Sequence, residues 1–223
     1  MGAVGAREAK YFENPDLSLR CAEEAVKINA HEYEAWSMIG AIHQEQKRYE
    51  LAIKALEHLP DCGDWGITKT RSLGDLMHQR GRFKEARTMY LLAQERVEIS
   101  GCAYPDALKA SVESRLGYVE VQLGMCSPGF RKLHHAVKVS PGEMENHERL
   151  IKAYVLRQHN RSAADVAEST LKHISNEKLF RRAVALRARL NEYERAATLV
   201  DDGLQVFPES IELQKMKIEI RAQ

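Results

Sequence analysis

Apolar residues recur three and four positions apart through most of the chain, the spacing that places side chains on one face of an α-helix. One such stripe consists of Leu17, Cys21, Ala22, Ala25, Val26 and Ile28. In the stretch from Tyr33 to Leu59 we expect the space between two helices to be filled by Trp36, Ile39, Ile42, Leu51, Ile53 and Leu56. Clusters of Gly and Pro, such as residues 60–64 and 127–129, separate such stretches. No segment alternates apolar and polar residues in the way of a strand, so the pattern predicts an all-α chain of short amphipathic helices.

Small residues recur with a fixed period. Gly40 and Gly74 are 34 residues apart, as are Ala52 and Ala86. The next interval, from Gly74 to Gly117, is 43 residues, so about nine residues are inserted there. The later intervals are of 34 and 33 residues, at Gly129, Ala163 and Ala196. A constant period of this length is typical of stacked supersecondary units.

The first clear unit carries Trp36, Gly40, Tyr49 and Ala52 at the spacings of the tetratricopeptide repeat, which it resembles. The resemblance extends over roughly Pro15 to Ser210. In two later units a larger residue stands where the family has Gly, at Ile151 and Val184.

The resemblance implies a right-handed α-solenoid of stacked antiparallel helical hairpins, with five to six repeats and a C-terminal capping helix. We expect a single array over residues 1–223. Its hairpins are predicted at residues 4–28 (degenerate), 33–59, 67–99, 106–139, 143–174 and 177–207, with the cap at 209–221.

Composition and charge limit the classes of function that are possible. Charged residues make up 29% of the 223 residues and the net charge is +1, so the chain as a whole is not suited to a bulk polyanion. It has no apolar run long enough to span a membrane and no signal peptide at its start, so we expect a cytoplasmic protein. The four cysteines form no CxxC pair and lack zinc-finger spacing, so we expect no metal site.

Motifs for catalysis are missing from the sequence. There is no Gly-rich phosphate loop, no GxSxG and no HExxH. Two acidic pairs, Glu23–Glu24 and Asp201–Asp202, have the character of solvated helix surface. We therefore expect that the chain is not an enzyme, with no catalytic residue and no cofactor.

In the tetratricopeptide family the first helices of the hairpins line the concave side, which suits peptide binding. Projected onto this sequence, that side is neutral or mildly acidic towards the N-terminus and basic towards the C-terminus. The predicted partner-binding residues are Arg71, Arg115, Tyr118, Arg149, Lys152, Lys178, Arg181, Arg182 and Arg189. The alternative is that these are ordinary solvated charges. Some family members grip a chaperone's C-terminal carboxylate, but in the first three clear units only Arg115 fits that pattern, and a later window keeps only Lys178 and Arg182.

These observations favour a scaffold that binds another protein or an acidic peptide in the groove. One alternative is a regulatory or substrate-recruiting domain of a larger enzyme. Another is nucleic-acid binding along the basic end, which would call for aromatic residues among the cations. Near that end stand only Tyr154 and Phe180, at positions expected in the core. The sequence does not specify the oligomeric state.

Overall fold

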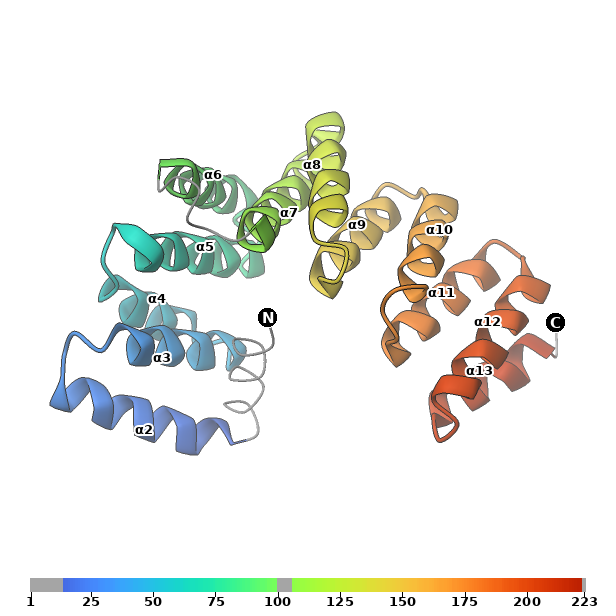
Figure 1. The fold of residues 1–223 in the computed structure, drawn as a ribbon, viewed down its shortest axis with the longest axis horizontal. Coiled ribbons are helices and arrows are strands. Elements are labelled where there is room, and N and C mark those ends of the chain that lie inside the picture. Colours follow the sequence, from blue (N-terminus) through green and yellow to red (C-terminus); the bar gives the residue numbers. More distant parts are fainter. Residues whose placement is uncertain (1–13, 100–105, 222–223) are drawn as a thin grey trace. The chain divides into compact units, whose positions relative to one another are not determined.

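The structure, a computed structural model, describes residues 14–99 and 106–221, and every regular element among them is a helix (Figure 1). The predicted first helix of the degenerate hairpin lies outside these residues. The helices are α2 (Pro15–Ile28), α3 (Tyr33–Glu45), α4 (Tyr49–Glu57), α5 (Gly63–Gln79), α6 (Phe83–Ile99), α7 (Asp106–Gln122), α8 (Cys126–Val139), α9 (Met144–Leu156), α10 (Asn160–Leu171), α11 (Glu177–Arg189), α12 (Tyr193–Val206) and α13 (Ile211–Arg221).

The chain divides into two compact units, Met1–Tyr104 and Pro105–Gln223. In the first unit each helix from α2 to α6 packs against the next. In the second unit α7 to α13 do the same, and α7 also packs against α9. Consecutive helices therefore form hairpins that stack on their neighbours, while one array over residues 1–223 stays a prediction.

Most predicted boundaries lie within three residues of the observed ones, and the start of α5 differs most. Helix α5 begins at Gly63, four residues before the predicted Ile67. Its first turn contains Asp64, whose negative charge suits the positive end of the helix dipole. Gly66 allows this turn to lie against the preceding loop, because a Cβ there would stand 2.6 Å from the backbone carbon of Asp61. The last two residues of the predicted turn cluster, Gly63 and Asp64, are therefore part of the first turn of α5.

The five hairpin turns share one backbone conformation. Each contains one residue in the left-handed region, with φ between 58° and 85°: Lys47, Gly81, Gly124, Gln158 and Asn191. In each turn the next backbone N–H donates to a carbonyl five residues earlier, for example from His159 to Tyr154 at 2.9 Å. This is the longer bond of the Schellman motif, which satisfies a free carbonyl at a helix end. The turn positions follow the same intervals as the small residues.

Small residues lie where the two helices of a hairpin touch. Ala52, Ala86, Ala136, Ala163 and Ala196 have no exposed surface. Between α7 and α8 the backbones themselves meet, since a Cβ on Gly117 would lie 2.7 Å from the carbonyl oxygen of Gly129. Hydrophobic clusters fill the spaces between hairpins, so the core runs through each unit between its helix layers.

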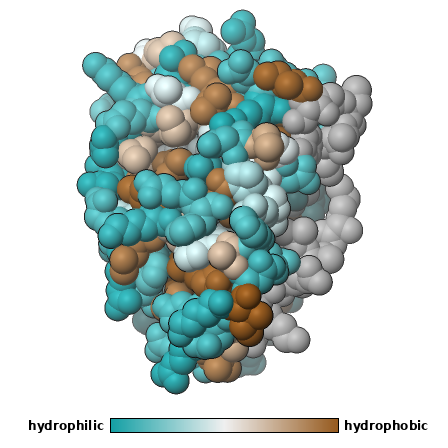
Figure 2. Space-filling view, turned by 90° about the vertical axis from the view of Figure 1, so that its left-hand side faces the viewer, coloured by the Kyte–Doolittle hydropathy of each residue, from teal (hydrophilic) through white to brown (hydrophobic). Residues whose placement is uncertain are grey.

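Helix α13 packs on α12 and α11 with Leu213 and Ile220 buried, while Ile211 and Ile218 are exposed. On the face shown in Figure 2, hydrophobic side chains form small groups among hydrophilic ones. None of the described helices is long and apolar enough to cross a bilayer.

A polar contact joins α9 to α10 in the interior. His147 is 5% exposed, its Nε2 lies 2.9 Å from the carbonyl oxygen of Pro141, and its Nδ1 lies 2.8 Å from the Thr170 hydroxyl. A neutral imidazole donates from Nε2 to Pro141, and its Nδ1 shares the single Thr170 hydroxyl proton with the carbonyl oxygen of Val166, which lies 2.7 Å from that hydroxyl. Burial lowers the pKa of His147, although the bond to Pro141 acts in the opposite direction.

We predict that Gly117→Ala lowers the free energy of unfolding. The added methyl meets a backbone oxygen, which cannot move aside as a side chain would, and overpacking costs about 1–3 kcal/mol. This exceeds the gain of up to about 1 kcal/mol from the better helix propensity of Ala. Urea denaturation measures the change, with Gly142→Ala as the control because nothing lies within 4 Å of a Cβ there. Equal stability of the two variants would contradict the close contact.

We also predict that His147 makes the protein less stable in weak acid. Its pKa is lowered in the folded state, so its contribution is complete above the unfolded value of about 6.5 and is lost as pH falls below it. Between about pH 7 and about pH 5, the stability of wild type should therefore fall more than that of His147→Gln. Denaturation at each pH gives the difference, and parallel curves for the two proteins would show that His147 is not responsible.

Candidate functional site

Eight of the nine predicted binding residues lie in the second unit, and Arg71 lies on α5 in the first. We use the term first-helix surface for the outward side chains of α7, α9, α11 and α13, which are the first helices of successive hairpins. Its charged and polar members are Arg115, Tyr118, Glu145, Glu148, Arg149, Lys152, Lys178, Arg181, Arg182, Arg189 and Glu212.

An ion pair joins each of these helices to the next. The pairs are Arg115–Glu145 at 3.5 Å, Glu148–Lys178 at 3.3 Å and Arg181–Glu212 at 4.0 Å. The four helices therefore present one continuous surface within the second unit. The structure brings the predicted residues of α7, α9 and α11 onto it.

Arg115 and Arg149 are held in place by groups of the protein itself. Glu145 accepts from Arg149 at 2.8 Å as well as pairing with Arg115. Arg115 also donates to the carbonyl oxygen of Ser111 at 3.2 Å, and Arg149 donates to the Ser114 hydroxyl at 3.3 Å. Their side chains are only 12% and 17% exposed. These two arginines help to fix α9 against α7 and offer little surface to a partner.

Glu148 neutralises two lysines in the same way. Lys152, one turn further along α9, lies 3.2 Å from its carboxylate, and Lys178 on α11 lies 3.3 Å from it. Burial raises the pKa of Glu148, but hydrogen bonds and charges from both lysines outweigh this and hold the pKa below its usual value. The carboxylate therefore stays ionised at neutral pH. As a result, α9 carries acidic charge that the predicted basic groove did not include.

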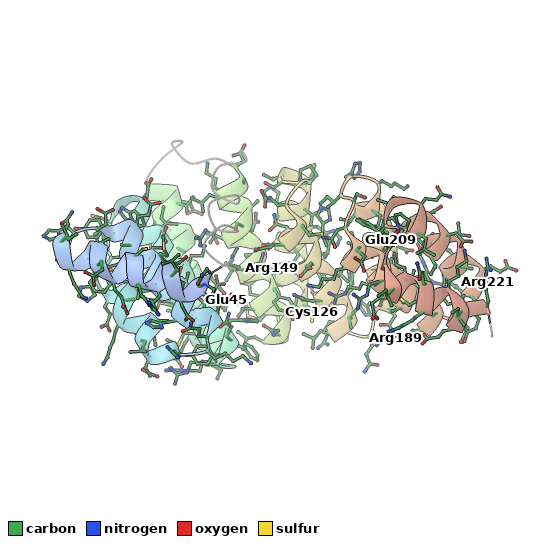
Figure 3. The ribbon with its side chains drawn as sticks, turned by 90° about the horizontal axis from the view of Figure 1, so that it is seen from below. Glu45, Cys126, Arg149, Arg189, Glu209 and Arg221 are labelled. Atoms are coloured by element: carbon green, nitrogen blue, oxygen red, sulfur yellow. The ribbon has the colours of Figure 1, made fainter. Side chains whose placement is uncertain are left out.

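Helix α11 has a different charge balance. Arg182 and Arg189 form no ion pair with any residue that the structure describes. They lie on one side of the helix with Ala185, at spacings of three and four residues. Burial raises the pKa of Tyr118, while the charges of Arg182 and Arg149 oppose the rise. Side chains from three successive first helices are thus close enough to influence one another. Figure 3 shows Arg149 and Arg189 apart along the unit.

The residues needed for a metal site do not converge. Within residues 14–99 and 106–221, no group of three or more His, Cys, Asp or Glu side chains could hold an ion. Cys21, Cys62 and Cys126 are free thiols.

A second charge cluster was missed by the sequence analysis. Arg187 on α11 is 1% exposed and contacts Asp165 at 2.6 Å, Glu192 at 2.9 Å and also Glu168. Burial would lower the pKa of Arg187, but the hydrogen bonds and charges of Glu168 and Asp165 raise it overall. The guanidinium links α10 to the next hairpin. Arg187 lies on the buried side of α11, where apolar residues are usual, and the acids three apart on α10 were the available signal.

The sequence itself matches no model of a known protein family and no curated protein. Solved structures do match, at low identity. PilW, a widely conserved type IV pilus biogenesis factor, has a TM-score of 0.67 and 17% identity, with 93% of each chain covered. Pseudomonas aeruginosa pilF has a TM-score of 0.61 and 14% identity, covering 98% of this chain and 100% of that one.

TTC0263, a thermophilic TPR protein of Thermus thermophilus, gives a TM-score of 0.59 and 14% identity. The match covers 86% of this chain and 100% of TTC0263. Together with the observed helices, these similarities confirm the predicted α-solenoid of helical hairpins.

We predict that Arg187→Gln destabilises the protein. Without the cation, Asp165 loses its ion pair, while Glu168 and Glu192 keep Arg195 and Arg161, so we expect a cost below the value of about 3–5 kcal/mol for breaking a fully buried pair. The control is Arg189→Gln on the same helix, which is exposed. Thermal or urea denaturation tests both. If Arg187→Gln unfolds at the same denaturant concentration as the control, the cluster does not hold the hairpins together.

Proposed function

We propose that this chain, which has the fold of tetratricopeptide-repeat proteins, is a scaffold that binds an acidic segment of another protein on the first-helix surface of its second unit. Stacked hairpins suit this role because they present a long surface made of side chains that the core does not need. The scaffold could act alone or as the recruiting domain of a larger enzyme, and the same surface would serve in both.

The charge of this surface supports an acidic partner. Its named members include seven cations and three acids, and all exposed or half-buried charged side chains of the four helices number eleven cations and seven acids. Both counts give a net charge of +4, whereas the whole chain has a net charge of only +1. Much of the excess lies on α11, with Lys178, Arg181, Arg182 and Arg189. Positive charge is therefore concentrated on one surface, where it can steer an acidic partner.

The observation that carries the proposal is the absence of ion pairs at Arg182 and Arg189 among the described residues. Neither guanidinium has a carboxylate of the described chain as its partner, so both can pair with carboxylates of a binding partner. A guanidinium binds a carboxylate through two parallel hydrogen bonds, which gives direction as well as attraction. We therefore place the centre of the binding surface on α11, further towards the C-terminus than α9.

The aromatic residues argue against nucleic acid as the ligand. Phe180 is 7% exposed, and Tyr154 stacks on Phe130 with its hydroxyl 2.7 Å from His134. Neither ring is free to stack on a base, which is the contact that single-stranded nucleic acid uses. An acidic protein segment therefore fits the surface better.

The test is a charge reversal on α11. We expect the triple variant Arg181→Glu, Arg182→Glu and Arg189→Glu to lose the partner that wild type captures from native extract. Three exposed ion pairs of up to about 1 kcal/mol each correspond to as much as roughly 100-fold in Kd. The affinity of wild type should also fall as salt rises, because salt screens exposed charges. Titration of the purified partner at several salt concentrations measures both effects.

A matched control reverses the same number of charges on the second helices. Arg131, Lys138 and Lys172 are exposed on or beside α8 and α10. The variant Arg131→Glu, Lys138→Glu and Lys172→Glu should bind like wild type. If this variant loses the partner while the α11 variant keeps it, the partner does not use the first-helix surface.

A further inference from the structure

A pocket opens beside the cations of α11, between α11, the start of α12 and α13. Its volume is about 420 Å³, within the range of ligand-binding pockets. The lining is mostly apolar, and Val184 and Ile220 at its base belong to the hydrophobic core. The residues around it are Val184, Ala185, Ala188, Arg189, Tyr193, Met216, Glu219 and Ile220.

The pocket and the cations share one side of α11. Arg182, Ala185 and Arg189 are spaced three and four residues apart, so they form a row along the helix, and two of them border the pocket. At 1.5 Å per residue the Cα atoms of Arg182 and Arg189 are roughly 10.5 Å apart. An apolar recess therefore adjoins a row that has a cation at each end.

Glu219 makes the two sides of the pocket opposite in charge. It lies on α13, across the pocket from α11, and forms no ion pair with the described part of the chain. A carboxylate is favoured on the Arg189 side and disfavoured on the Glu219 side. A ligand that enters between them is therefore held in one orientation.

We propose that the pocket receives an apolar side chain from an acidic amphipathic helix of the partner, which narrows the proposed function and rests on it. On such a helix, acidic residues at i and i+7 are also about 10.5 Å apart, and an apolar residue at i+3 or i+4 shares their face. The two carboxylates bind Arg182 and Arg189 while the apolar side chain enters between them. This is recognition of a helix by its i, i+4 and i+7 positions.

The test uses the full chain and a synthetic probe. The probe is a stapled helix of Ala and Gln with Glu at i and i+7 and Leu at i+4. Met216 lines the pocket and provides a local signal, because its ¹³C-labelled methyl group can be observed by NMR and assigned from the spectrum of Met216→Leu. We expect the probe to shift this resonance. Replacing the probe's Leu with Ser should weaken binding about tenfold or more, given the apolar area that Leu buries.

Filling the pocket provides a second measurement. Ala188→Leu should weaken binding of the probe about as much as the loss of its Leu, while Ala41→Leu, an exposed control on α3, should not. Melting curves show whether each variant is folded. If Ala188→Leu unfolds, the affinities of the wild-type protein for the Leu probe and the Ser probe still test whether the pocket binds an apolar side chain.

The two proposals can fail separately. If charge reversal on α11 removes the native partner but the probe leaves the Met216 methyl unchanged, the scaffold proposal stands and the pocket proposal is wrong. If the Met216 resonance shifts when the protein alone is concentrated, a second copy fills the pocket, which also overturns it. If Ser in place of Leu makes no difference to the probe, the pocket does not bind an apolar side chain.

Discussion

The close approach of two helices within each hairpin is the constraint on which the rest of the structure depends. Between α7 and α8 the contact is so tight that Gly117 and Gly129 face each other's carbonyl oxygens. In the other hairpins fully buried alanines occupy the contact. Because interiors are close-packed, these positions admit almost no other side chain. Small residues therefore recur at most of these contacts, which produces the period of the sequence, although Ile151 and Val184 replace the glycine in two hairpins and one interval is of 43 residues.

The same constraint explains which parts of the fold could be predicted. Burial of small and apolar residues leaves a direct trace in the sequence, and the helices follow that trace. The left-handed turns are less easily recognised in the sequence. Gly81 and Gly124 mark two of them, but Lys47, Gln158 and Asn191 adopt the same conformation without being glycine. Most residues are disfavoured there by roughly 1–2 kcal/mol. The repeated turn bond and the packing of both helices hold them in place, and the packing is not local.

The candidate site divides in the same way. The solvent-facing positions of α9 and α11 follow from helix periodicity, and so do pairs four residues apart, such as Glu145 with Arg149. The partners of Arg115, Lys178 and Arg181 lie 30 or 31 residues away, on the next first helix. Those pairs depend on how the hairpins stack, which the sequence pattern does not specify. This is why the C-terminal part of the groove was expected to be basic, whereas α9 is largely neutralised.

Stacking also decides what each arginine of α11 does. Arg187 faces the preceding hairpin, meets three carboxylates and becomes part of the interior, while Arg182 and Arg189 face outward. The difference of two and five positions turns the side chain to another side of the helix. Arg187 is therefore needed for the fold, since its replacement leaves buried charge behind. Arg182 and Arg189, which face outward, can be replaced without destabilising the core. A repeat chain can therefore acquire a specific binding surface on α11 while its stability depends on other residues of the same helix.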